Sequence, residues 1–468
     1  MEDSAMLILD TKEWAEVTFG TCELGDVRRN RRLILVAQDV AARPDGSTPE
    51  QTESWGDCKA AYRLFNQDDV TFDRIIAPHC QQTREVCRSG DVKLIINDTT
   101  EIDYGHKRQA TGLGPTGNGS GRGFFLHSAL MVDVADGRVD GLAGQILFHR
   151  KPKRKRGAKN TRRRSADRES VVWGDLVDQV GRAPEGVKWV HVDDRGADDF
   201  EVFSRIQAQG NSCVIRAARL NRTMTSLDGC TRTLKELLET LPCQDVRELQ
   251  VPAQKDSPAR QATLELRFTE VRMPVPKVLT PWLKERRPLE SLTLWVVELR
   301  EVNVPKGITG LHWVLYTMEP VTKIAQANTV IAWYERRPTI EDYHKALKTG
   351  CHVEQRYYET SDRLERVTGL LSVVAVRLMQ LKTAAKETPD RPAREVAPLQ
   401  WVRLVQMARR KPVNENMTIY EFVRALGGLG GHLGRKSDGE PGWITVWRGF
   451  EKLMLLVRGN DLIRKRCG

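Results

Sequence analysis

The order of strand and helix patterns in the middle of the chain constrains the fold most. Three buried-strand patterns follow one another at residues 92–98, 124–134 and 141–149. A glycine-rich break separates the first two patterns, and Asp136-Gly137, a pair typical of hairpin turns, separates the last two. These segments can pair as consecutive antiparallel strands.

The next segments alternate between helix and strand. Apolar residues at helical spacing predict helices at 170–180 and 199–209, and apolar runs at 188–194 and 212–219 predict a fourth and a fifth strand. Three strands followed by this alternation predict an α/β fold with a mixed sheet of the ribonuclease-H type.

Shifts in composition divide the chain into regions. Residues 1–72 predict a small helical domain with a basic face, and residues 73–370 contain the α/β core. Within that core, alternating strands separated by Pro-rich turns predict an inserted mostly-β subdomain at about 225–316. The pattern of residues 371–468 predicts a helical C-terminal domain, which contains a Pro-rich charged linker at 386–398.

The positive charge of the chain is concentrated in one segment. Residues 150–168 hold eleven Lys or Arg against one acidic residue, so this segment accounts for +10 of the formal net charge of +11. A run of this kind can contact a polyanion by releasing counterions from phosphates, or it can be a loop that only aids solubility. The rest of the chain is nearly neutral.

Composition narrows the cellular setting. With 40% hydrophobic and 29% charged residues, no apolar run long enough to span a membrane and no signal-peptide pattern, the sequence predicts a cytoplasmic protein. Its nine cysteines form no CxxC pair, so we expect them to be reduced, mostly buried and not zinc-binding.

Two of the predicted strands end in an aspartate on an apolar face. Because side chains alternate along a strand, Asp98 shares a face with Leu94 and Ile96, and Asp194 shares a face with Val190 and Val192. Two inward carboxylates at neighbouring strand ends imply protonation, salt bridges or a divalent cation. Each aspartate could instead cap a helix or a turn. Asp193 competes with Asp194 for the second position, and the alternation favours Asp194.

A third acidic candidate lies in a polar helical stripe. Tyr334, Arg337, Glu341 and Lys348 are spaced three, four and seven residues apart and could face one phosphate chain. A solvated face with ordinary ion pairs is the alternative interpretation. Pro338 interrupts the pattern, either by kinking the helix or by starting a new one.

These motifs resemble those of the DDE transposases of bacterial insertion sequences of type four, which carry a Y-(2)-R-(3)-E-(6)-K signature. The resemblance spans nearly the whole chain, and its main motifs are WAEVTFGTCELGDVRRNRRL, INDTTEIDY, DRGAD and YERRPTIEDYHKALKTG. It implies that Asp98, Asp194 and Glu341 are the catalytic ligands of two Mg²⁺ ions, which Mn²⁺ can replace. Hard carboxylate oxygens suit these ions. The resemblance also implies cleavage through a hairpin intermediate and joining of the 3′-hydroxyl ends to target DNA.

The resemblance assigns DNA contacts as well. Tyr334, Arg337 and Lys348 would grip phosphates near the transposon tip, and Trp313 would stack on a flipped base unless it is a core indole. Further positions that would face DNA are Arg195, Arg216, Arg28, Arg29 and Arg32, the last three on the end-recognising helix of the N-terminal domain.

Assembly is implied too. The tail aligns with the family's dimerisation region, and its stripe of Trp443, Trp447, Phe450 and Leu453 could pack on a partner helix or inside the monomer. A homodimer would synapse two transposon ends of double-stranded DNA.

Two features depart from the family pattern. Pro338 stands where a bulky aromatic is usual, and the basic 150–168 segment replaces an acidic one; we expect this segment to bind flanking or target DNA. A non-catalytic or inhibitory DNA-binding relative is the alternative function, and it predicts the loss of an acidic ligand or of the N-terminal domain.

Overall fold

One large mixed sheet organises the chain. The computed structural model describes residues 11–105, 110–150, 169–251, 259–286, 291–395, 397–435 and 438–467. Within these ranges, twelve strands form a sheet of order β2-β3-β1-β5-β6-β12-β11-β10-β7-β8, with β4 on β3 and β9 on β10. The strands are β1 (Val92–Asp103), β2 (Gly114–Thr116), β3 (Gly121–Asp133), β4 (Val139–Phe148), β5 (Lys188–Asp193), β6 (Ser212–Arg216), β7 (Thr223–Ser226), β8 (Thr231–Thr233), β9 (Asp245–Val251), β10 (Arg260–Met273), β11 (Leu292–Val302) and β12 (His312–Thr317).

The five predicted strands are confirmed and lie together in one half of the sheet, in the order β4-β3-β1-β5-β6. β3 pairs antiparallel with both β1 and β4, whereas β5 pairs in parallel with β1 and with β6. β1 continues to Asp103, beyond its predicted end, because its second half keeps pairing with β3 as far as Gly123. The sheet is therefore mixed, as the sequence predicts.

The inserted strands extend this sheet. β12 pairs antiparallel with β6, with Leu315 opposite Arg216, and β11 and β10 follow outward. The insertion also contributes α9 (Leu234–Thr240) and α10 (Pro281–Arg286). The insertion is thus joined to the central strands by main-chain hydrogen bonds.

Helices cover the two faces of the central strands. On one face, Ile95 and Trp189 pack with Leu176 and Val180 of α7 (Val171–Val180), which lies beside α8 (Phe200–Ala208). On the other face, the neighbouring residues of β1 and β5 join the main apolar core together with α5 (Phe72–Glu85) and α13 (Ser361–Glu387). The alternation of side chains along each strand produces this division.

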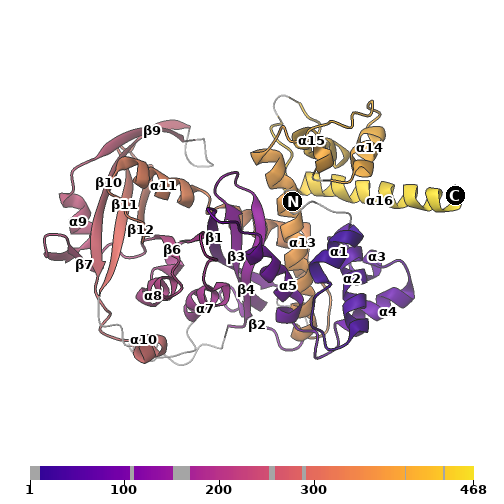
Figure 1. Cartoon of the computed structure of the whole chain (residues 1–468), viewed down its shortest axis with the longest axis horizontal. Helices are drawn as coiled ribbons and strands as arrows, with labels where there is room; N and C mark the ends of the chain where they lie inside the picture. Colours follow the sequence, from indigo (N-terminus) through magenta and orange to yellow (C-terminus); the bar gives the residue numbers. More distant parts are fainter. Residues whose placement is uncertain are drawn as a thin grey trace.

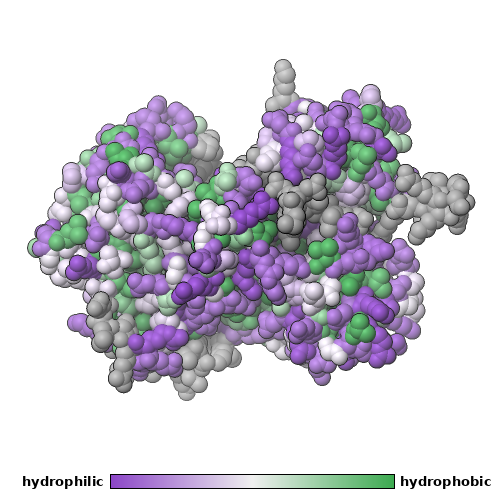
Figure 2. Space-filling view, viewed as in Figure 1, coloured by the Kyte–Doolittle hydropathy of each residue, from purple (hydrophilic) through white to green (hydrophobic). Residues whose placement is uncertain are grey.

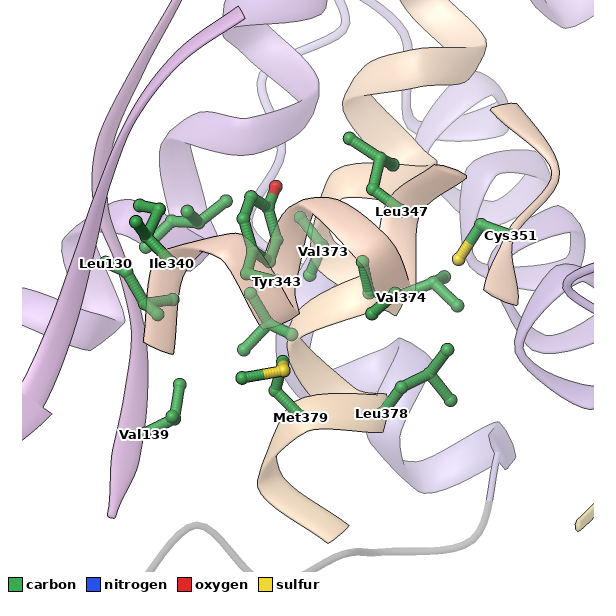
Figure 3. Close-up of a cluster of buried hydrophobic side chains, with 14 of the residues drawn as sticks. Leu130, Val139, Ile340, Tyr343, Leu347, Cys351, Val373, Val374, Leu378 and Met379 are labelled. Carbon is green, nitrogen blue, oxygen red and sulfur yellow. The ribbon is translucent and has the colours of Figure 1, made fainter. Parts of the chain in front are cut away.

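Helix α13 is the centre of the molecule (Figure 1). Its buried residues, among them Val373, Val374 and Leu378, face Ile340 and Tyr343, as Figure 3 shows. These two residues belong to α12 (Thr339–Lys345), which follows α11 (Ile324–Glu335) and leads into a π-helical turn, Ala346–Gly350.

Smaller helical groups lie at both ends of the chain, on the same side of α13 (Figure 1). The N-terminal group contains α1 (Thr11–Phe19), α2 (Val27–Ala42), α3 (Thr48–Gln51) and α4 (Trp55–Leu64). The C-terminal group contains α14 (Leu399–Ala408), α15 (Ile419–Leu429) and α16 (Trp443–Cys467). Asp26 starts α2 by accepting a hydrogen bond from the N–H of Arg28, and Arg43 caps the end of this helix.

The C-terminal apolar stripe belongs to the core. The exposed fractions of Trp447, Phe450 and Leu453 are 5%, 2% and 0%, and Phe450 meets Trp401 with ring centroids 5.3 Å apart. Packing inside the monomer is therefore the correct interpretation for these three, and the interpretation of them as an exposed partner stripe is wrong. The side chain of Trp443 lies outside the described residues.

Most of the described cysteines are buried, as the sequence predicts. The eight described cysteines are free, and five of them are buried. The face drawn in Figure 2 is largely hydrophilic, with small apolar groups between charged ones. No described helix is long and apolar enough to cross a membrane.

Residues 151–168 of the basic segment lie outside the described residues, and Arg150 and Glu169 on either side of them form a 2.9 Å ion pair.

The lowered pKa of one buried histidine, His79, lets us predict how the stability of the fold depends on pH. His79 accepts a hydrogen bond from the N–H of Leu142 at 3.1 Å, and burial lowers its pKa from 6.5 to about 4. The unfolded chain therefore binds a proton that the folded chain excludes, and stability is lost as the pH falls below about 6.5. The His79 share of this loss is on the order of 3 kcal/mol by pH 4.

Urea unfolding at several pH values between 7 and 4 tests this expectation. His79→Gln should flatten the acid side of the profile, while His352→Asn, at a part-exposed position with positive φ, should keep the wild-type slope. Equal slopes for both variants would contradict the assignment.

Candidate active site

The two aspartates predicted from strand alternation come together at one edge of the sheet. In the parallel β1/β5 pair, Leu94 lies opposite Val190 and Ile96 opposite Val192. Two residues further along, Asp98 and Asp194 follow on the same face. Asp194 lies just past β5, where its Oδ1 accepts a 2.6 Å hydrogen bond from the N–H of Gly196. It is thus a turn cap and a member of the cluster.

Asp193 points to the opposite face. Its exposed fraction is 1%, and its Oδ1 accepts a 2.6 Å hydrogen bond from the side chain of Asn97. Burial raises the pKa of Asp193 well above its usual value, which favours the neutral form. Asp193 is therefore a buried partner of β1, and Asp194 faces the cluster.

Glu341 reaches the cluster from a new helix. Helix α11 ends at Glu335, and Pro338 caps α12, so the proline starts a helix instead of kinking one. The polar stripe from Tyr334 to Lys348 therefore runs over two helices and a π-helical turn. Of the two roles left open for Pro338, the start of a new helix is the one observed, and Arg337 and Glu341 still meet across it.

The guanidinium of Arg337 joins the three carboxylates. One of its terminal nitrogens, Nη2, lies 2.8 Å from Asp98 Oδ2 and 3.9 Å from Asp194 Oδ2, and the other, Nη1, donates to Glu341 Oε1. The side-chain exposed fractions of the three acids are 17%, 40% and 48% in the same order. Asp98 is thus the enclosed member, and the other two face outward.

Burial raises the pKa of Asp98 to about 6. Arg337 and the N–H of Thr99, which donates to Oδ1 at 2.8 Å, oppose this rise, whereas the carboxylates of Asp194 and Glu341 add to it. The acids therefore repel one another and need a cation between them.

The donor set fits a divalent cation. Carboxylate oxygens are the hard ligands that Mg²⁺ and Mn²⁺ prefer, and a positive charge already lies at their common focus. Within the described ranges, no group of three or more His, Cys, Asp or Glu side chains has the spacing of a metal site. In this structure the Arg337 guanidinium lies between the three carboxylates.

Aromatic and basic residues flank the cluster. Trp313 of β12 is half-buried and meets Tyr334 edge-on, with ring centroids 5.2 Å apart. Burial raises the pKa of Tyr334, and Arg216 and Arg337 oppose that rise. Arg216 also donates to the carbonyl oxygen of His312 at 2.9 Å. These residues form a continuous wall that runs from β12 and β6 to Arg337.

Two other predicted residues lie apart from the carboxylates. Lys348 forms a 3.2 Å ion pair with Glu354, whose carboxylate also accepts a 3.1 Å hydrogen bond from the N–H of Asp103. Arg195 follows Asp194 and is exposed. Among the described residues, no contact joins Lys348 or Arg195 to the side chains of the three acids.

The N-terminal arginines differ in their exposure. Arg28 is 85% exposed and pairs with Asp26, whereas Arg29 pairs with Asp69 at 2.5 Å and Arg32 with Asp57 at 3.1 Å. Arg29 and Arg32 are therefore engaged within the domain. The sequence interpretation missed two exposed residues nearby, Arg31 and Trp55. Periodicity along α2 could have found Arg31, which is on the side opposite buried Leu33 and Val36.

A groove of about 440 Å³ between α4 and the chain before α13 was also missed. It is lined by Tyr62, Arg63, Asn66, Tyr357, Tyr358, Glu359 and Arg363. Arginines and exposed aromatic rings are the side chains that contact phosphates and bases. Its two walls lie about 300 residues apart along the chain, as in the Arg363–Asn66 contact, so no local pattern could have predicted it.

The acidic cluster thus lies beside aromatic and basic side chains, the kinds of side chain that contact bases and phosphates. Two family models match the chain: residues 11–70 match a transposase DNA-binding model, and residues 373–467 match a transposase Tn5 dimerisation domain. Together they support a transposase of the Tn5 type, with DNA and a second copy of the chain as partners.

The glycine after Arg195 predicts a strict steric requirement. A Cβ on Gly196 would lie 2.7 Å from the Trp173 ring and 3.0 Å from Asp194 Oδ1. Gly196→Ala should therefore shift the turn that holds Asp194 and lower the free energy of unfolding by about 1–3 kcal/mol. Gly459→Ala in α16, where no atom lies within 4 Å of the added carbon, is the matched control. Equal thermal stability of the two variants would contradict the clash.

Proposed function

We propose that the chain is a cut-and-paste transposase that binds the terminal inverted repeats of an insertion sequence and excises it by hydrolysis. Excision passes through a hairpin intermediate, and the 3′-hydroxyl ends are then joined to target DNA. The observation that carries this proposal is the meeting of Asp98, Asp194 and Glu341 around one guanidinium, with Asp98 and Arg337 239 residues apart in the sequence.

The core is of the ribonuclease-H type in this proposal. The strand order β4-β3-β1-β5-β6, with the first three strands antiparallel and β1, β5 and β6 parallel, supports it. Ligands of open α/β sheets bind beyond the carboxyl ends of parallel strands. Asp194 lies just past that end of β5, and Asp98 lies on β1 two residues past its last pair with β5.

Asp98, Asp194 and Glu341 would hold two Mg²⁺ ions, and Mn²⁺ would substitute. When bound, such ions activate a water or 3′-hydroxyl nucleophile and stabilise the leaving oxygen of an in-line displacement. The chain itself contributes position: the Gly196 N–H orients Asp194, and the Thr99 N–H orients Asp98. Their hydrogen bonds leave the second oxygen of each carboxylate directed at the cluster.

Phosphate contacts would come from three residues of the polar stripe. Arg337, at the acids, presents a planar fork that suits two phosphate oxygens. Tyr334, whose ring meets Trp313, would join it, and Lys348, which lies apart from the acids, would add a point charge. Trp313 would stack on a base turned out of the duplex. Arg216 and Arg195 extend the positive surface around this position.

The N-terminal and C-terminal regions would bind the transposon ends and bring two of them together. The DNA-binding match over residues 11–70 supports recognition of the transposon ends, with exposed Arg28 nearest to solvent and Arg29 and Arg32 supporting the helix. The dimerisation match over residues 373–467 supports a homodimer that synapses two ends. The protein would act in the cytoplasm of a bacterial cell, at the nucleoid when bound to DNA.

The alternative, a non-catalytic or inhibitory relative, is less well supported. All three acidic residues are present, and the DNA-binding match remains at the N-terminal end.

Substitution of the acids tests the proposal. Asp98→Ala, Asp194→Ala and Glu341→Ala should each lower plasmid excision by at least about 100-fold, because each removes a metal ligand. Asp342→Asn removes the neighbouring carboxylate, which pairs with Lys345 at 3.5 Å, and should retain excision. DNA binding in a mobility-shift assay should persist in all four variants. Full excision by any of the three alanine variants would refute the assignment.

We expect substitution of Trp313 to impair hairpin formation and to leave first-strand nicking intact. Trp313→Ala should slow hairpin formation by about 5–150-fold, which corresponds to the roughly 1–3 kcal/mol of a base–aromatic stack, while first-strand nicking continues. Trp313→Phe should recover part of the rate. Equal loss of nicking and hairpin in gel assays of end cleavage would instead indicate a core role beside Tyr334.

A further inference from the structure

The contacts of Arg337 differ from those of an ordinary surface ion pair. Its guanidinium is shared among three carboxylates, and its Nε is buried without a hydrogen-bond acceptor among the described residues. A buried donor without a partner is costly. In its observed position this side chain therefore neutralises the carboxylates, while its own Nε donor stays without an acceptor among the described residues.

We infer that Arg337 is an exchangeable counter-ion: it neutralises the acidic cluster in the free protein and is released when a DNA phosphate takes the guanidinium and divalent cations take the carboxylates. This inference rests on the proposed function and adds a coupling between its two ligands. Arg337 thereby acts as a positioning residue for metal binding in addition to its phosphate contact.

Each exchange brings together groups of opposite charge. Divalent cations replace the single positive charge that the three acids share. A phosphate can accept from Nε and one terminal nitrogen together, the two-bond geometry typical of arginine, and would supply the acceptor that Nε lacks. Because the free-energy coupling between two ligands is reciprocal, each ligand should raise the affinity for the other by the same factor.

The local fold permits such an exchange. Arg337 lies between the end of α11 and Pro338, in the turn that joins two helices, so its side chain can rotate without disturbing a helix interior. Ile340 and Tyr343 in the next turn are fully buried and hold α12 on the core. The acid at position 341 can stay in place while the guanidinium leaves.

The exchange can be tested by titrating the free, full-length protein with Mn²⁺. Isothermal calorimetry and electron paramagnetic resonance of unbound Mn²⁺ measure the binding. Arg337→Gln should bind Mn²⁺ about tenfold more tightly than wild type, because the competing charge is gone. Lys345→Gln is the charge-matched control: Lys345 is on α12, 63% exposed and paired with Asp342, so its variant should bind like wild type. Thermal unfolding of each variant checks that it is folded.

A second arm measures the coupling. A duplex oligonucleotide carrying one transposon end should tighten Mn²⁺ binding by wild type more than by Arg337→Gln. An affinity for Mn²⁺ that is unchanged or weaker in free Arg337→Gln would overturn the counter-ion role. Asp98→Asn separates this failure from that of the proposed function: if it leaves Mn²⁺ affinity at the wild-type value, the acids are not the metal site at all.

Discussion

The packing of α12 between the sheet and α13 is the constraint on which the candidate site depends. Asp98 and Glu341 are far apart in the sequence, and no strand or helix pattern holds them together. Ile340 and Tyr343 of α12 are fully buried, and Figure 3 shows them between strands and α13. Burying such side chains stabilises by roughly 1.5–3 kcal/mol each, far more than an exposed ion pair does. The apolar face therefore places the acid, and the guanidinium contacts follow from that placement.

Electrostatics then sets the state of the cluster. Three carboxylates at one edge repel each other, and the burial of Asp98 makes its charge the most costly, which is why its pKa rises to about 6 even with Arg337 beside it. A site of this kind is not arranged for the stability of the free protein. Its acids gain the most when further positive charge arrives, and this is the property that a phosphodiester-cleaving centre requires.

The strands and the choice of Asp194 over Asp193 could be predicted because they depend on a local rule, the alternation of side chains along a strand. The parallel register of β1 and β5 carries that rule across to Asp98. The spacing from Tyr334 to Lys348 left the role of Pro338 open, and the structure shows that it starts a new helix, with Lys348 apart from the acids and paired with Glu354. The pairing of Arg29 with Asp69 and of Arg32 with Asp57, the core position of Trp447 and the groove beside α4 depend on contacts between distant segments. Such contacts leave no periodic signal.

The inserted β strands fix the position of Trp313 relative to the acidic cluster. Because β12 pairs with β6, Trp313 is fixed to the same hydrogen-bonded sheet as Asp98 and Asp194. Its ring then packs edge-on against Tyr334, three residues before Arg337. A separate domain on a flexible link would leave the distance between indole and acids variable. Continuity of the sheet makes that distance a property of the fold, so a base held by Trp313 and a phosphate held by Arg337 would keep one spacing relative to the carboxylates.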